Sequence, residues 1–374
     1  MRVTCLQENL FKGLNIIGRA VASRTTLPIT QNVLLETDES RLKLSATNLE
    51  IAVSTWVPGE IIEEGSLTVP ARLLSEFVGA LPNENVNLTS EVDPYSLTVN
   101  CARFDARIMG TDAVEFPPLP TVSSGISVQV HSKVLRKAVT EVVFAAATTE
   151  DRPVLTGVQM ELGEGKFTLA AADGFRLAVH SSPVDGSISE SVSAIVPAKS
   201  FSELNRLLGD HDQLVEIRLD ADRGQILFQL ENTEMVSQLI QGSFPNYTQL
   251  IPQQWTTRST VEVDGFLRTT RTAAIFARDG SGIVRLHLTP GSPGSLHMLA
   301  RADEVGENKS EMDAQIEGEE AKVAFSSKYL IDVLNVIGEQ NVTVELTNPS
   351  SPGVFRPLGS DNYVHVIMPM FVQW

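Results

Sequence analysis

The sequence has few of the residues on which several protein classes depend. Only two of its 374 residues are cysteine, Cys5 and Cys101, and their separation excludes a CxxC pair and a disulfide-stapled secreted domain. No apolar run reaches the roughly 18 residues that cross a bilayer. The first residues are interrupted by Glu8, Lys12 and Arg19 and lack the apolar core of a signal peptide. These absences predict a protein of the reducing cytoplasm.

Patterns that carry catalysis or bind metals are also missing. The six histidines are scattered, without HExxH spacing, and there is neither a GxSxG elbow nor a Walker-type glycine-rich loop. Asp173 and His180 flank the strand letters RLAV, an arrangement that does not favour an acid–base pair. The sequence therefore indicates a binding or structural protein, not an enzyme, with no catalytic residue, metal or cofactor.

Positive charge is scarce overall but concentrated in places. The chain holds 29 Lys and Arg against 46 Asp and Glu, and its net charge of −17 argues against a nucleic-acid partner. However, the helices predicted at Glu8–Arg24, His131–Ala147 and Asp264–Arg278 each carry three basic residues against one acidic residue. Amphipathic helices often carry cations on a solvated face, but the same sign in three copies favours a polyanion partner.

Three segments repeat one helical pattern along the chain. They are VPARLLSEFVGAL (Val69–Leu81), VPAKSFSELNRLL (Val196–Leu208) and FSSKYLIDVLNVI (Phe325–Ile337), and their starts lie 127 and 129 residues apart. Apolar residues recur three and four apart, which places one helix face against a core. Such a period indicates three copies of one structural unit. The fourth and eighth places hold a basic and an acidic residue in each copy (Arg72 and Glu76, Lys199 and Glu203, Lys328 and Asp332).

The basic residue of each copy falls in the first helical turn, where the macrodipole disfavours positive charge. It either pairs with the acid four residues later, although basic-before-acid is the weaker order, or serves a polyanion outside the protein. Both interpretations stay open from the sequence. Pro70 and Pro197 stand at first-turn positions, where proline is tolerated.

Each unit has the predicted order strand, helix, strands, helix, strands, which indicates an α+β fold with two helices packed on antiparallel sheets. Phe116–Pro120 and Phe244–Pro252 are proline-rich linkers between units. The acidic run Ala302–Glu320 is predicted as a solvated face or loop. The predicted domains are residues 1–122, 126–253 and 258–374.

The motifs TLPIT (Thr26–Thr30), TVPAR (Thr68–Arg72), AADGFRLAV (Ala171–Val179), FPNYTQLIP, YLIDVLN and YVHVIMPM stand in order along the chain. In these motifs and over its full length, the chain resembles the bacterial DNA polymerase III beta subunit family, the sliding clamps. The resemblance implies a DNA replication factor in which two chains, each half of a ring, join head to tail around duplex DNA. It also implies that the clamp tethers the replicative polymerase and binds the clamp loader and other clamp-binding peptides.

Helix packing supports the dimer independently of the resemblance. Helices packed ~10 Å apart in a circle of six leave a bore of only ~9 Å once the helix diameter is subtracted. The DNA major groove alone is about 12 Å wide. Twelve helices leave ~28 Å. We therefore expect two chains to enclose a duplex.

The expected site residues fall into three groups. Those facing DNA are Lys12, Arg19, Arg24, Arg72, Lys133, Arg136, Lys137, Lys199, Arg268, Arg271 and Lys328. The resemblance implies a partner-peptide pocket at Leu155, Gly174, Phe175, Arg176, Leu177, Pro245, Leu250, Tyr329, Ile367, Met368, Pro369 and Met370, of which Leu177 and Ile367 are also typical core residues. We place the dimer interface at Phe104, Ile108, Ile275 and Phe276.

Three features depart from the family pattern. Gln249 stands where an arginine is common, Asn246 replaces a usual aspartate, and Phe371–Trp374 extends past the usual ending. These departures affect the rim of the pocket and its peptide preference. The alternative function is a clamp-like peptide-binding scaffold that does not encircle DNA.

Overall fold

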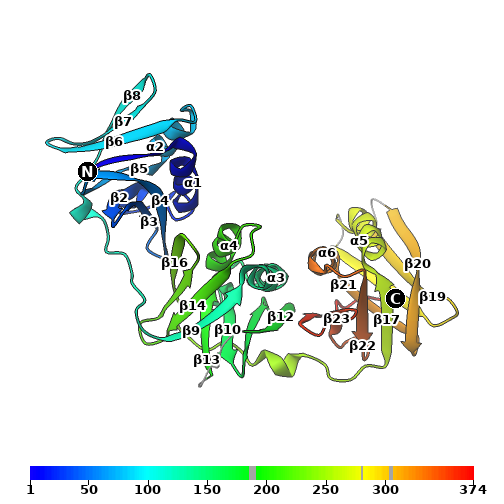
Figure 1. Ribbon diagram of the computed structural model, residues 1–374. Coiled ribbons are helices and arrows are strands. Elements are labelled where there is room, and N and C mark those ends of the chain that lie inside the picture. Colours follow the sequence, from blue (N-terminus) through cyan, green and yellow to red (C-terminus); the bar gives the residue numbers. More distant parts are fainter. Residues whose placement is uncertain (185–190, 279–280, 303–305) are drawn as a thin grey trace. The chain divides into compact units, whose positions relative to one another are not determined.

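The structure is a computed structural model that describes residues 1–184, 191–278, 281–302 and 306–374. Figure 1 shows the helices and strands of these residues. They form two compact units. Unit 1 comprises Met1–Lys133 and Ser202–Leu239, and unit 2 comprises Val134–Phe201 and Ile240–Trp374. The boundary crosses α3 (Ser132–Val142) and α4 (Ala198–Leu207).

Unit 1 contains the helices α1 (Gln7–Ile17) and α2 (Ala71–Gly79) and the short 3₁₀ helices η1 (Pro28–Gln31) and η2 (Ala113–Glu115). Its strands are β1 (Arg2–Leu6), β2 (Asn32–Asp38), β3 (Arg41–Thr47), β4 (Ile51–Glu63), β5 (Ser66–Pro70), β6 (Asn85–Val92), β7 (Tyr95–Cys101), β8 (Phe104–Met109), β9 (Ile126–His131), β14 (Leu214–Asp220), β15 (Gln225–Gln229) and β16 (Thr233–Gln238).

One antiparallel sheet runs through unit 1 in the order β8-β7-β6-β1-β4-β16-β15-β14-β9, with β2, β3 and β5 attached beside β4. The long strand β4 joins the first repeat to the second. Its first half pairs with β16, from Ile51 opposite Ser237 to Thr55 opposite Thr233, and its second half pairs with β1. The first two repeats are therefore joined by continuous strand pairing.

Unit 2 contains α5 (Val263–Ala277), α6 (Ser327–Val336) and the 3₁₀ helices η3 (Val143–Ala145), η4 (Pro153–Thr156) and η5 (Tyr247–Leu250). Its strands are β10 (Gly157–Gly163), β11 (Lys166–Ala172), β12 (Arg176–Pro183), β13 (Val192–Pro197), β17 (Thr257–Glu262), β18 (Ile283–Thr289), β19 (Gly294–Ala302), β20 (Gly306–Gly318), β21 (Ala321–Ser326), β22 (Asn341–Leu346), β23 (Gly353–Pro357) and β24 (Tyr363–Ile367).

The sheet of unit 2 follows the order β13-β10-β11-β12-β24-β23-β22-β17-β20-β19-β18-β21, again antiparallel. Here β12 of the second repeat pairs with β24 of the third, from Arg176 opposite Ile367 to His180 opposite Tyr363. The two seams, β4–β16 and β12–β24, are built alike.

The helices pack through the apolar stripes that the sequence predicts. Leu10, Leu14 and Ile17 of α1 are buried, and burial of each such side chain stabilises the fold by about 2 kcal/mol. Helix α5 is capped by Glu262, whose carboxylate accepts hydrogen bonds from the backbone N–H groups of Asp264 and Gly265. Helices α1 and α2 lie side by side, as do α5 and α6 (Figure 1).

Three local predictions need correction. Helix α1 ends at Ile17 with Gly18 at its C-cap, because glycine has low helix propensity, so Arg19 and Arg24 lie in the turns and bends that follow the helix. Pro70 and Pro197 end the strands β5 and β13, one residue before the helices.

The described part of the acidic run is also not a loop. It forms β20, whose residues are mostly exposed, so the prediction of a solvated face is correct and the loop is wrong; Asp303–Val305 fall outside the described residues. Nine residue pairs with β19 hold this strand in place despite its charge.

Candidate functional site

The seam of unit 2 begins at a tight turn that precedes β12. Asp173 Oδ1 accepts hydrogen bonds from the backbone N–H groups of Phe175 and Arg176, at 2.9 and 3.0 Å. Gly174, between Asp173 and Phe175, has a φ of 92°. This left-handed conformation favours glycine. The carbonyl oxygen of Phe175 accepts a hydrogen bond from Met368 N at 2.8 Å, which fixes the tail after β24 to the turn.

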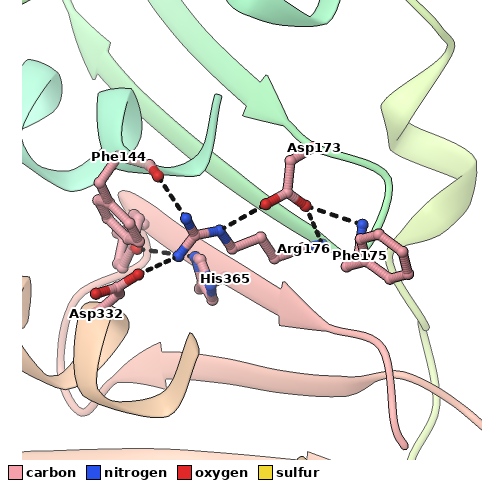
Figure 2. Close-up of polar contacts among 7 residues, drawn as sticks. Phe144, Asp173, Phe175, Arg176, Asp332 and His365 are labelled. Carbon is pink, nitrogen blue, oxygen red and sulfur yellow. Dashed lines mark hydrogen bonds and ion pairs between the residues drawn. The ribbon is translucent and has the colours of Figure 1, made fainter. Parts of the chain in front are cut away.

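The guanidinium of Arg176 connects the second repeat to the third (Figure 2). It donates to Asp173 Oδ2 at 3.1 Å, to Asp332 Oδ2 of α6 at 2.5 Å and to the Phe144 carbonyl oxygen at 2.7 Å. The Phe144 and Tyr329 rings lie 5.2 and 4.6 Å from its central carbon. Only 8% of Arg176 is exposed. Charged hydrogen bonds and ring contacts therefore position this residue within unit 2.

His365 of β24 lies beside this network. Its ring stacks on Phe144 with 5.5 Å between centroids, and its Nδ1 lies 3.2 Å from the Tyr363 hydroxyl. Burial, assisted by the nearby positive charge of Arg176, lowers the pKa of His365 to about 3. The imidazole is therefore neutral at physiological pH.

Successive side chains of a strand alternate between faces, so Leu177 lies on the opposite face of β12 from Arg176. That face is apolar. Leu177 belongs to a buried cluster with Tyr247, Val364 and Val366, and Phe244 packs against this cluster. Leu177 and Ile367 are fully buried, as the core interpretation predicted. Arg176 and Leu177 thus contribute to different faces of the seam.

Exposed apolar side chains surround this seam. Phe175, Leu250 and Met368 are about half exposed, and Phe371 in the tail is 90% exposed. Tyr329, Pro369 and Met370 are partly exposed, Gly174 and Pro245 are exposed, and Leu155 is buried. The backbone N–H of Met370 donates to the Ala324 carbonyl at 2.8 Å, so the tail runs beside β21.

The acid–base pair considered from the sequence does not form, since Asp173 bonds Arg176. His180 instead lies 2.5 Å from Glu141 Oε2 through Nδ1 and 2.6 Å from Ser182 Oγ through Nε2. Glu141, His180 and Ser182 are all buried, so a substrate in solution cannot reach this hydrogen-bonded group. Among the described residues, no cluster of His, Cys, Asp and Glu is suited to hold a metal ion, and no helix is long and apolar enough to cross a membrane.

All eleven basic residues expected to face DNA are exposed. The first-turn cations behave differently in the three copies. Arg72 Nε lies 2.7 Å from Glu76 Oε1, as the pairing interpretation predicts. Glu203 instead pairs with Arg206, and Asp332 pairs with Arg176. The pairing interpretation therefore holds in the first copy alone.

Other cations of this set also have partners. Lys133 lies 3.7 Å from Asp212, and Arg271 donates to Asn335. Lys137 lies 3.0 Å from Glu339 and 3.7 Å from Glu141. Partial burial would lower the pKa of Lys137, but the two carboxylates outweigh it and raise the pKa. Within the described ranges, no ion pair engages Lys12, Arg19, Arg24, Lys199, Arg268 or Lys328.

The residues expected at the dimer interface lie on β8 and α5. Strand β8 is an edge of the unit 1 sheet, with Phe104 half exposed and Ile108 turned into the core. Ile275 of α5 is 57% exposed, and Phe276 is partly exposed. An exposed edge with apolar side chains is a surface on which another strand can pair.

Comparisons with known proteins cover the whole chain. Family models of the DNA polymerase III beta subunit match residues 1–120 (N-terminal domain), 129–246 (central domain) and 248–371 (C-terminal domain). A beta sliding clamp from Synechocystis is 30% identical over 391 residues, with 99% of each chain covered. The chain belongs to the DNA polymerase III beta subunit family. A beta sliding clamp from Bacillus subtilis is 29% identical over 99% of each chain.

Solved clamp structures share the fold. The DNA polymerase sliding clamp of Bacillus subtilis matches with a TM-score of 0.95 and 29% identity, and a Pseudomonas aeruginosa clamp bound to griselimycin with 0.93 and 28%; both comparisons cover 100% of each chain. The predicted α+β fold of three clamp domains is thus confirmed.

Sequence reasoning missed several residues of this clamp-family seam. Phe144 contributes a carbonyl and a ring, and Asp332 binds a residue 156 positions away. No local pattern could connect them, because the two partners are 156 residues apart in the sequence. Glu339, which accepts a hydrogen bond from Lys137, was also missed, because the two residues are 202 positions apart.

Proposed function

We propose that this chain is a sliding clamp: a processivity factor, without catalytic activity, that encircles duplex DNA and tethers the replicative polymerase. The observation that carries the proposal is the full-length match to three beta-subunit domains and to solved sliding clamps. We infer clamp domains at residues 1–122, 126–253 and 258–374, half of a ring in each chain, and a cytoplasmic location.

The exposed helix cations would hold DNA through its phosphates. Lysine and arginine attract the backbone without reading sequence, and salt screens that attraction. Lys12 on α1 and Arg268 and Lys328 on α5 and α6 have side chains without ion-pair partners in the described residues, so they are the strongest candidates. Lys137 contributes less, since two carboxylates already engage its ammonium. Retention would come from closure of the ring.

The apolar rim of the unit 2 seam would bind short peptides of partners, including the polymerase and the clamp loader. Phe175, Leu250 and Met368 offer exposed apolar surface next to a backbone fixed by hydrogen bonds. Flexible methionine suits a groove that accepts several sequences. The Pseudomonas aeruginosa clamp structure with griselimycin supports a ligand site on clamps of this fold. Phe371, beyond Met370, extends the apolar rim.

A homodimer would complete the ring head to tail. The edge strand β8 carries the exposed Phe104, and α5 carries the exposed Ile275. Light scattering should give twice the chain mass of 40.7 kDa. A mass of one chain at micromolar concentration would contradict this assembly.

A processivity assay tests the function. A bacterial replicative polymerase and clamp loader extend one primer on circular single-stranded DNA, while excess challenger DNA traps any polymerase that dissociates. The chain should lengthen the products of a single binding event, and Phe175→Ala with Met368→Ala should shorten them again. If the wild-type chain leaves product length unchanged, the proposed clamp function is refuted. If only the double variant fails to lengthen the products, peptide binding is lost while the ring can still form.

A further inference from the structure

The seam of unit 1 reproduces the backbone of the proposed peptide site in unit 2. Asn48 Oδ1 accepts hydrogen bonds from the N–H groups two and three residues later, at 3.0 and 2.9 Å, as Asp173 Oδ1 does at 2.9 and 3.0 Å. Gln238 N donates to the Glu50 carbonyl at 3.0 Å, the counterpart of the Met368–Phe175 bond. The same turn therefore holds the same neighbouring strand in both places.

A groove of about 400 Å³ lies at this first seam. One wall is the turn from Thr47 to Ala52, and the other is the linker from Pro117 to Thr121. Just after the linker, Val122 is buried with Leu227 and Val236. The linker is thus anchored as one side of a defined groove.

Leu49, on the wall of this groove, has an unusual backbone conformation. Its φ is 76°, in the region where glycine is favoured, and the equivalent residue of the second seam is Gly174 with a φ of 92°. Leu49 is nevertheless 55% exposed and lines the groove. The chain therefore holds an apolar side chain on the groove wall where its own repeat uses glycine.

The polar side of the groove carries one cation, Arg223, and one exposed carboxylate, Glu50. The Arg223 side chain is 58% exposed, and its Nε lies 3.8 Å from Asp220 Oδ2. That carboxylate also accepts hydrogen bonds from Ser124 Oγ at 2.7 Å and from Arg223 N at 3.0 Å. Because guanidinium has five N–H donors in a planar fork, Arg223 retains donors for a carboxylate. Gln225 and Gln238 add amides suited to a peptide backbone.

We propose that this groove is a second peptide site, which binds a short linear segment of a partner protein that carries one apolar and one acidic side chain. An apolar side chain of that segment packs on Leu49 and Leu119, and a carboxylate pairs with Arg223. The proposal rests on the peptide site assigned to the second seam. The two sites select different sequences, because Glu50 stands where Phe175 stands and Ile51 where Arg176 stands.

Peptide display on the full-length protein tests the proposal. A library of random segments of about eight residues, a length that spans such a groove, is selected on the wild-type chain. Enriched peptides are then titrated by fluorescence anisotropy against Leu49→Gly, Arg223→Gln and the second-seam control Phe175→Ala. Leu49→Gly removes the side chain while relieving the backbone, so the variant should fold, as its unchanged or higher Tm will show.

We expect one group of peptides with an acidic residue near an apolar one. Their Kd should rise about tenfold or more in Leu49→Gly and in Arg223→Gln, and less than twofold in Phe175→Ala. The proposal is overturned if no peptide is enriched, or if every enriched peptide weakens only in Phe175→Ala. Weakening only in Phe175→Ala would refute the second peptide site and leave the proposed clamp function intact. Failure of the processivity assay would refute the clamp function without changing the measured peptide binding at the first seam.

Discussion

Arg176→Met is the substitution that tests the construction of the unit 2 seam most sharply. Methionine keeps most of the side-chain volume but removes every donor. The carboxylates of Asp332 and Asp173 and the Phe144 carbonyl then lose the guanidinium that lies between them. The change therefore leaves partly buried acceptors without this donor.

The size of the effect follows from burial. Breaking a buried, hydrogen-bonded ion pair costs about 3–5 kcal/mol. Asp332 keeps a side-chain exposure of 28%, so solvent recovers part of that cost and we expect about 2–4 kcal/mol. For a unit of this size, such a loss lowers Tm by roughly 10 °C.

Differential scanning calorimetry is the assay, because it separates the transitions of a multidomain chain. Arg206→Met is the matched control, since Arg206 forms an exposed pair with Glu203, and its Tm should change by less than about 2 °C. Adding Asp332→Asn to Arg176→Met should recover part of the loss, because it removes the unpaired charge. Equal Tm shifts for Arg176→Met and Arg206→Met would refute the role of Arg176.

The remaining predictions concern pH, DNA and assembly. The buried His365 stays neutral down to about pH 3, whereas its imidazole in the unfolded chain takes up a proton near pH 6.5. The free energy of unfolding should therefore fall by about 1.4 kcal/mol per pH unit as the pH drops from 6.5 to 3. In urea titrations, His365→Gln should flatten this dependence on pH. Lys12→Gln with Arg268→Gln should reduce the slope of log K against log salt by up to about 4, because each of the two chains in the proposed ring loses two cations, and Lys166→Gln on β11 should not reduce it. Phe104→Asp should halve the mass measured by light scattering, and an unchanged mass would move the interface elsewhere.

Sequence periodicity predicted the helices well but not their ends or their polar partners. Apolar spacing located α1, yet it could not show that the helix stops at Ile17, because Arg19 and Arg24 fit the same charge pattern. The acidic composition of β20 suggested a solvated face or a loop, and the segment is an exposed strand because pairing with β19 overrides the weak local preference of charged residues for strands.

The seams show the limit more clearly. The partner-peptide positions were transferred from a resemblance, and the structure separates them into the buried Arg176, the core residues Leu177 and Ile367, and an exposed rim. The Arg176–Asp332 bond depends on two repeats coming together, which no local pattern encodes. The likeness between the turns at Asn48 and Asp173 became visible only through their hydrogen bonds, since the letters around them differ.

The topological claim is tested most directly by cutting DNA beneath the protein. Fluorescent protein is placed on a nicked circular plasmid by a clamp loader and washed in about 0.5 M salt, which weakens contacts held by phosphate attraction alone. A restriction enzyme then opens the circle while fluorescence is followed. We predict retention on the circle and release within seconds to minutes of cutting; release at the same rate from cut and uncut plasmid would contradict encirclement.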